Sequence, residues 1–149
     1  MSEEHVFHVS SSWSPSGKEG RLKNADGTFA VPFSAAPSLG GKSGVTNPEE
    51  LLLSALEACF VQTWSIFLAK LKVPIENPVL EGSCEVDKDP DGGFRVTKLD
   101  LVPHVPKALW DKRKEDVEKT LALAEKYCIV SKAVRGEGRD LLVTPKLVD

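Results

Sequence analysis

The longest apolar stretch of the chain, from Pro48 to Leu71, predicts a buried helix. Its apolar side chains fall on every face of a helix instead of forming one stripe. A helix that is apolar all round is buried in a core or at an interface. Pro74 and Pro78 cannot continue a helix, so we expect this one to end near Leu71.

The residues around Asn47 suit the start of this helix. Thr46 and Asn47 are both good N-cap residues, and Pro48 suits the first helical position. Glu49 and Glu50 suit the first turn, because the N-terminal end of a helix favours negative charge. Thr46 and Asn47 each have a glutamate three residues on, which is the spacing of a capping box, so two registers stay open.

Alternating polarity predicts two strands after the helix. From Leu80 to Asp87 every second residue is apolar or small, as in a half-buried antiparallel strand. A glycine-containing turn leads to a return strand, Phe94–Val102. Its alternation slips between Val96 and Leu99, which predicts a bulge.

The N-terminal third also predicts strands. His5–Trp13 is rich in strand-forming residues, and Arg21–Phe33 has a hairpin signal at Asp26 and Gly27. Residues 34–45 are mostly small and are expected to form a loop.

The C-terminal part predicts a second helix and a closing strand. Lys107 to Val134 carries an apolar stripe and is expected to be helical in two parts. The segment from Arg139 onward closes the chain as a strand with Pro145 near its edge. The order of strands, helix, strands, helix and strand predicts an α+β fold with an antiparallel sheet.

Length and charge limit the possible classes of protein. The 149 residues predict one domain spanning 1–149. A net charge of −3 argues against a nucleic-acid partner. The N-terminus lacks the features of a secretory signal, and the longest uncharged run in the apolar helix is 12 residues, whereas a membrane span needs about 20. We expect a cytoplasmic protein that has no membrane partner.

Three cysteines are the candidate chemistry of the chain. In a cytosolic protein they are packing groups, metal ligands or redox groups, not a disulfide scaffold. Cys84 lies on the apolar side of its predicted strand and is expected to pack as a small hydrophobe. Cys59 and Cys128 lie on predicted helices, and packing is the simplest interpretation of each alone. Both lie on faces expected to meet in the core, where two thiols can form a disulfide without a metal.

Other kinds of site lack their sequence patterns. There is no Cys-x-x-Cys, and His5, His8 and His104 have no ligand spacing to the cysteines, so no metal is expected. The segment GGKSG lacks the spacing of a phosphate-binding loop, and no nucleophile elbow of a hydrolase is present. No cofactor is expected.

Four segments carry a family resemblance. They are TNPEELLLSALEACF (46–60), CIVSKAVRG (128–136), SLGGKSG before the helix and DGGF (91–94). Cys59 stands ten residues after Glu49, and Cys128 follows 69 residues later. With this similarity over nearly its whole length, the chain is identified as a member of the OsmC/Ohr family, the osmotically inducible and organic-hydroperoxide-resistance proteins.

The resemblance implies an OsmC-like α+β fold in which two chains form an intertwined homodimer, with long central helices and antiparallel sheets outside them. Active sites in the family lie at the dimer interface, and Trp64 is a candidate to face the partner. The implied activity is that of a thiol peroxidase which prefers organic hydroperoxides. By resemblance, Cys59 is the peroxidatic cysteine, Cys128 the resolving cysteine and Glu49 an acid of the site. An external dithiol, often lipoyl-linked in relatives, would reduce the disulfide.

The basic residue of the site departs from the family pattern. Burial raises the pKa of a thiol, and Cys59 lies about three turns from the start of its helix, so we expect a nearby cation to stabilise the thiolate. In the family an arginine held by the glutamate has this role. The matching turn here, SGKEGR, has Lys18 at that position and Arg21 three residues later. Lysine lacks the forked geometry of arginine. Three alternatives follow: Arg21 reaches the site, Lys18 replaces the arginine, or neither does and the peroxidase activity is weak or altered.

Two functions follow from these features. The first is a cysteine-based hydroperoxide reductase. The alternative, suggested by the missing arginine, is a non-peroxidase OsmC-like protein that binds a small ligand or senses redox state at the dimer interface. Rapid turnover with a dithiol would exclude this alternative.

Overall fold

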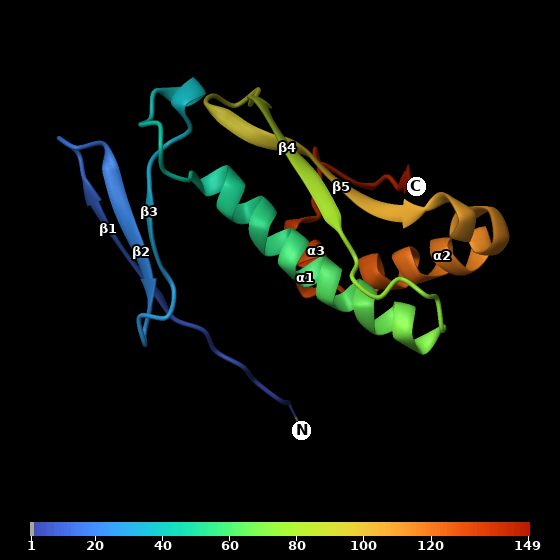
Figure 1. Cartoon of the computed structure of the whole chain (residues 1–149). Coiled ribbons are helices and arrows are strands. Elements are labelled where there is room, and N and C mark those ends of the chain that lie inside the picture. Colours follow the sequence, from blue (N-terminus) through green and yellow to red (C-terminus); the bar gives the residue numbers. More distant parts are fainter. Residues whose placement is uncertain (1) are drawn as a thin grey trace. The chain divides into compact units, whose positions relative to one another are not determined.

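A computed structural model describes residues 2–149, which pack as two compact units. The first unit ends at Leu51 and the second begins at Leu52. Figure 1 gives the order of the elements along the chain. A single domain over 1–149 stays a prediction, and each unit is described by itself below.

The first unit is built on a three-stranded antiparallel sheet. Its strands, β1 (Val9–Ser14), β2 (Glu19–Asn24) and β3 (Ala30–Phe33), lie in the order β1-β2-β3. A short 3-10 helix, η1 (Pro37–Leu39), interrupts the loop that follows. The hairpin predicted over Arg21–Phe33 is confirmed.

The turn between β2 and β3 has the residues that its geometry requires, which is why Asp26 and Gly27 predicted a hairpin. Gly27 has a φ of 75°, a conformation that favours glycine. The backbone N–H of Thr28 donates to Asp26 Oδ1 at 3.0 Å, which closes the turn through a side chain.

β1 begins at Val9 and not at His5, so the predicted start of this strand is wrong. The partner strand β2 ends at Asn24, which pairs with Val9. Residues 2–8 therefore have no neighbouring strand to receive their backbone hydrogen bonds.

The long helix α1 (Pro48–Lys70) starts where the sequence predicts. Asn47 is the residue that caps it, because the N–H of Glu50 donates to Asn47 Oδ1 at 2.9 Å. The Glu50 carboxylate accepts a hydrogen bond from Thr46 Oγ1 at 2.8 Å. Of the two registers left open by the sequence, the structure therefore has the one that pairs Asn47 with Glu50.

The C-terminal end of α1 is closed by backbone and side-chain hydrogen bonds. Lys72 takes a φ of 53°, and the N–H of Val73 donates to the Leu68 carbonyl at 2.9 Å, as in a Schellman motif. Arg113 donates to the carbonyls of Lys72 at 2.7 Å and Leu71 at 3.3 Å. Arg113 itself interrupts the regular geometry of its own helix, with φ −140° and ψ 36°.

The second unit contains a mixed sheet. Its strands are β4 (Leu80–Lys88), β5 (Phe94–Pro106), β6 (Asp140–Val143) and β7 (Lys146–Val148). β4 pairs antiparallel with β5, whereas β6 and β7 run parallel to β5. The α+β class is confirmed, but the expectation of a purely antiparallel sheet is wrong for this unit. Two helices lie between β5 and β6 in the sequence, and such crossovers join parallel strands.

The predicted bulge is confirmed in the β4–β5 pair. Glu85 pairs with Lys98, but the next residue, Val86, pairs with Val96, so Thr97 has no partner of its own in the ladder. Beyond the bulge β5 alternates strictly, and Leu99, Leu101 and Val105 are all buried.

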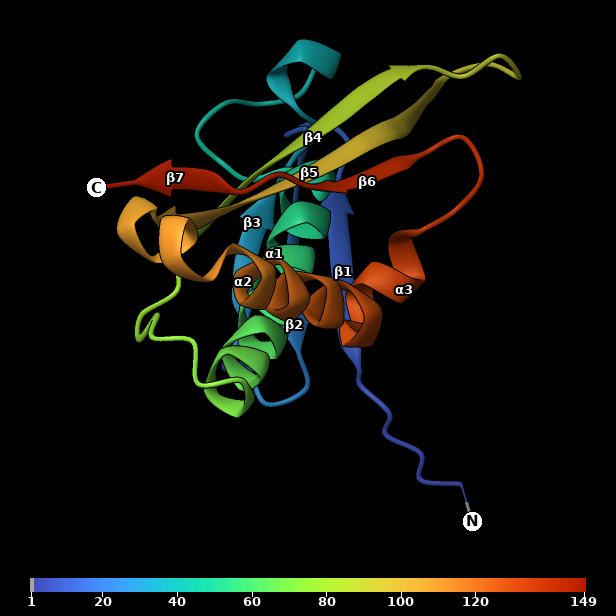
Figure 2. The ribbon, with the colours of Figure 1, turned by 90° about the vertical axis from the view of Figure 1, so that its right-hand side faces the viewer.

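Three helices cover one face of this sheet, as Figure 2 shows. They are α1, α2 (Lys107–Tyr127) and α3 (Ile129–Val134), which confirms the prediction of a second helix in two parts. The buried core combines side chains of α1, β5 and α2, and its members include Leu56, Phe60, Trp64, Leu99, Leu101, Val105, Val117 and Leu121.

Trp64 belongs to this core. Its side chain is 0% exposed, and its indole N–H donates to Thr120 Oγ1 at 2.9 Å. The expectation that Trp64 faces a partner chain is therefore wrong, because the indole is enclosed within its own chain and finds its hydrogen-bond partner there.

Several apolar side chains of α1 are only partly covered by the chain itself. In length and composition α1 is apolar enough to cross a membrane, a property that it shares with many core helices of soluble proteins. Only 22% of its most apolar window is buried within the chain, and Ile66 is 53% exposed. Ile66 is thus the one large apolar side chain that α1 exposes within the described residues.

Candidate active site

The second unit brings Cys59 and Cys128 together. Cys59 lies in the middle of α1 and is half-buried, whereas Cys128 lies between α2 and α3 and is 0% exposed. The Cys128 thiol is hydrogen-bonded to the Cys59 sulfur. The two groups are thus placed for direct reaction with each other, and neither is in a disulfide.

The start of α3 supplies backbone donors to both sulfur atoms. Cys128 is extended, with φ −65° and ψ 117°, so it breaks the helix and leaves the first N–H groups of α3 without helical partners. The backbone N–H groups of Ile129 and Val130 hydrogen-bond to Cys59. The backbone N–H of Ser131 donates to Cys128 Sγ at 3.4 Å.

These contacts lower the pKa of Cys59. Burial acts in the opposite direction and is the largest single influence, because it disfavours the thiolate. Hydrogen bonds from Val130, Cys128, Ile129 and Thr63 together outweigh it, so the pKa of Cys59 lies below the ordinary value of a cysteine. Since the thiolate is the nucleophile, this arrangement activates Cys59.

The pKa of Cys128 moves in the other direction. Burial raises it most, the contacts with Ser131 lower it, and the hydrogen bond to Cys59 together with the charge of Cys59 raises it again. When two titrating neighbours are pushed apart in this way, the environment has assigned them different roles. Of the two thiols, Cys59 is the one that ionises first.

The backbone donors were missed by the sequence reasoning, which expected a cation to stabilise the thiolate. No charged side chain is among the groups that lower the pKa of Cys59. The signal was present but weak: a predicted helix in two parts implies an interruption with unpaired N–H groups, yet no side-chain pattern placed that interruption at Cys128.

Glu49 occupies the first turn of α1, in the first unit. Its Oε2 atom is buried and has no hydrogen-bond partner among residues 2–149. An unsatisfied buried carboxylate oxygen is costly, so this atom is a candidate to accept a hydrogen bond from a further donor.

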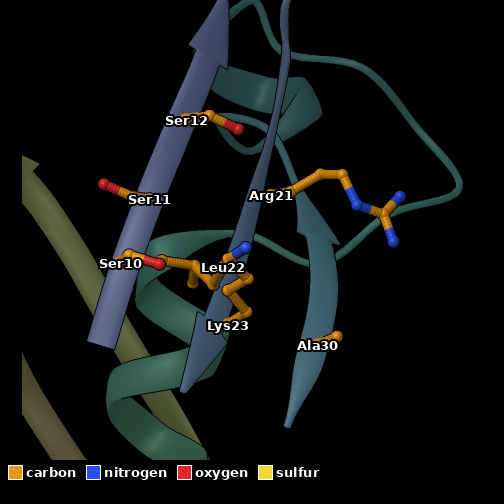
Figure 3. A pocket seen from close by; sticks show the side chains of 7 residues that line it. All are labelled: Ser10, Ser11, Ser12, Arg21, Leu22, Lys23 and Ala30. Atoms are coloured by element: carbon orange, nitrogen blue, oxygen red, sulfur yellow. The ribbon is translucent and has the colours of Figure 1, made fainter. Parts of the chain in front are cut away.

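Lys18 and Arg21 are also in the first unit. Lys18 lies in the turn between β1 and β2 with a φ of 50°, and its carbonyl accepts a hydrogen bond from Ser34 Oγ at 2.6 Å. Arg21 is exposed on β2 and lines a shallow hollow of about 280 Å³ with residues 10–12 of β1. Figure 3 shows its guanidinium extending away from β1. Whether either one serves the cysteine pair stays a prediction.

Cys84 lies on β4, on the half-buried side predicted for it, and packs against the core. Within residues 2–149 no three His, Cys, Asp or Glu side chains gather as a metal site requires.

Comparison with known proteins gives the family. Residues 40–139 match the model of the OsmC-like protein family. The chain therefore belongs to the OsmC-like proteins.

The named relatives point to one biological role. An organic hydroperoxide resistance protein-like 2 of Staphylococcus epidermidis is 34% identical over 122 residues, which is 80% of this chain and 82% of the relative. The organic hydroperoxide resistance protein of Xanthomonas axonopodis pv. citri is 30% identical over 139 residues, 91% of this chain and 92% of the relative. The family is thus one implicated in organic hydroperoxide resistance.

The fold agrees with this assignment. A crystal structure described as an organic hydroperoxide resistance protein OsmC from Legionella pneumophila superimposes with a TM-score of 0.81 at 22% identity. The match covers 98% of this chain and 100% of that one. At 22% identity this structural similarity establishes the fold of the chain and nothing about its activity.

Proposed function

We propose that this chain is a thiol-dependent hydroperoxide reductase that prefers organic hydroperoxides. The observation that carries the proposal is the hydrogen-bonded pair in which Cys59 has the lowered pKa and Cys128 the raised one. The names of the relatives support the choice of substrate class.

In the first step the Cys59 thiolate attacks the distal oxygen of the peroxide. The O–O bond breaks, an S–O bond forms, and the departing alkoxide takes up a proton and leaves as an alcohol. Cys59 is then a sulfenic acid, and the peroxide has been reduced by two electrons.

In the second step Cys128 attacks the sulfenic acid. An S–S bond forms, the S–O bond breaks, and the hydroxyl group leaves with the Cys128 proton as water. An external dithiol, for which a lipoyl-linked group is our candidate, then reduces the disulfide and is itself oxidised to a disulfide.

The acid and base of the site are proposed as a pair. Glu49 would hold a basic side chain, either Arg21 or Lys18, through its unsatisfied carboxylate oxygen. The cation would stabilise the negative charge that develops on the peroxide oxygens.

A homodimer is the proposed working form of the protein. The exposed Ile66 and the partly covered apolar side chains of α1 suit contact with a second copy of the chain, and most soluble oligomers are symmetric homo-oligomers. A cytoplasmic location is also proposed, because the N-terminal sequence lacks the features of a secretory signal. Dithiol reductants keep thiols reduced in that compartment.

The direct test is peroxide consumption by the reduced protein. Cumene hydroperoxide and hydrogen peroxide would be compared by stopped flow, with thiol groups counted before and after. We expect the loss of two thiols per chain, faster with the organic peroxide, and turnover when a dithiol is supplied. Slow oxidation that does not depend on the peroxide would instead favour the alternative, a non-peroxidase member that binds a ligand or senses redox state.

A further inference from the structure

Ser131 is a buried residue whose hydroxyl has no clear task. Its side chain is 0% exposed, and Oγ has no hydrogen-bond partner of ordinary geometry among residues 2–149. The same residue donates its backbone N–H to Cys128 Sγ at 3.4 Å, and its hydroxyl is near enough to that sulfur to affect it. Buried hydroxyls are nearly always satisfied, so an unsatisfied one beside a reacting sulfur calls for an explanation.

We propose that Ser131 is a positioning residue for the second half of the reaction. Its backbone N–H holds the Cys128 sulfur against Cys59, and its hydroxyl becomes a second donor to that sulfur when the sulfur is an anion. This inference rests on the proposed function, since Cys128 has nothing to attack unless Cys59 becomes a sulfenic acid.

The second donor matters most after Cys59 has been oxidised. In that state the Cys128 thiol is a donor toward Cys59, and the charge on Cys59 opposes a second anion beside it. Oxidation of Cys59 to the neutral sulfenic acid removes this charge. Burial still raises the pKa of Cys128, but the contacts with Ser131 also remain, and they favour the thiolate. Cys128 thus becomes easier to ionise at the stage where it must attack.

Ser131 is not consumed in this step. Cys128 gives up its proton and attacks the sulfenic sulfur, the S–S bond forms, and hydroxide leaves with the proton as water. The Ser131 hydroxyl keeps its own proton and only stabilises the charge on the attacking sulfur.

The test separates the two halves of the reaction in the full chain. Reduced protein is mixed with cumene hydroperoxide, quenched at intervals with a sulfenic-acid trap, and analysed by mass spectrometry for sulfenic acid and disulfide. In Ser131→Ala we expect sulfenic acid to form within about twofold of the normal rate. Disulfide formation should be about 10- to 100-fold slower, as expected for losing a hydrogen bond to a charged group. Sulfenic acid should accumulate, as in a Cys128→Ser reference.

Two further variants make the result specific. Ser131→Thr keeps the hydroxyl and should restore disulfide formation to within about threefold of normal. Lys132→Ala changes the exposed neighbour on α3 and should leave both steps unaltered. An unchanged disulfide rate in Ser131→Ala would overturn the proposal, and so would a loss of both steps that Ser131→Thr does not rescue. If the unaltered protein forms no sulfenic acid, the proposed function fails first and the role of Ser131 falls with it.

Discussion

The start of α3 and the β1–β2 region, which comprises the turn with Lys18 and the strand with Arg21, offer two different means of stabilising negative charge. The start of α3 has neutral donors, the N–H groups of Ile129 and Val130, which contact Cys59 within the second unit. The β1–β2 region has charge, carried by Lys18 and Arg21 in the first unit. The sequence pointed to the charged region alone, and the structure adds the neutral one.

Under the proposed function, this difference separates two tasks, the ionisation of the thiol and the reduction of the peroxide. The donors that lower the pKa of Cys59 all belong to the second unit, and none of them is charged. What is left for a cation is the charge that develops on the peroxide oxygens during attack, where preorganised charge has its largest effect. The two regions should therefore respond differently to two reagents: an alkylating agent, which reports on the thiolate, and a peroxide, which reports on both tasks.

The largest effect is expected from removing the thiol on which both regions would act. Cys59→Ser should lower peroxide consumption at least about a thousandfold, because a serine hydroxyl is not ionised at neutral pH. The measurement is the stopped-flow rate with cumene hydroperoxide.

Cys84→Ser is the matched control for this variant. It changes a third cysteine that lies on β4, and its rate should stay within about twofold of normal. Full peroxide consumption by Cys59→Ser would remove the thiol chemistry from this site altogether.

The next largest effect is expected from the charged region. Arg21→Ala should slow peroxide consumption about 10- to 100-fold, since a guanidinium can hold a carboxylate and an oxyanion with paired hydrogen bonds. Alkylation of Cys59 by iodoacetamide should change by less than about twofold, because the thiolate has its own donors.

Lys18→Ala is measured in parallel, and we expect its rate of peroxide consumption to fall less than that of Arg21→Ala. A larger loss in Lys18→Ala would transfer the role to the lysine. If both variants consume peroxide normally, no cation is needed. The backbone donors at the start of α3 would then be the only ones of the two regions that serve the reaction.

A smaller effect is expected from the neutral region. The fraction of Cys59 thiolate rises as the pH rises through its pKa, and because that pKa is lowered, alkylation should reach half its maximum at a lower pH than for an ordinary cysteine. Cys128→Ala removes one hydrogen-bond donor, so at acidic pH alkylation of Cys59 should slow by about 2- to 10-fold.

The profile is measured on the Cys59 peptide by mass spectrometry, in a Cys84→Ser background. A profile for Cys128→Ala that moves to lower pH would contradict the assignment of Cys128 as a donor to Cys59.

Features that depend on interactions between residues close in the sequence could be predicted, whereas features that depend on distant residues could not. The bounds of α1, the alternation of β4 and the bulge of β5 were readable because caps and alternating polarity are local properties. The parallel pairing of β6 and β7 with β5 was not, since it depends on where a long connection returns the chain.

The candidate site shows the same limit. The spacing of Cys59 and Cys128 and their resemblance to a family marked the pair. The N–H donors were not foreseen, because they arise from one extended residue between two helices. Cysteine is not among the residues preferred at an N-cap, so the sequence did not mark Cys128 as the start of α3.

The smallest effect is expected at the start of α1, the helix that begins in the first unit and carries Cys59 in the second. Asn47→Ala removes the acceptor for the Glu50 N–H and should lower the free energy of unfolding by about 1 kcal/mol, measured by urea denaturation. Asn47→Asp keeps an acceptor oxygen and should stay close to the unaltered protein. Alkylation of Cys59 should be unchanged in both, since its donors come from the start of α3. Slower alkylation in Asn47→Ala alone would mean that the cap helps to position the thiol, and the two regions would then not act independently.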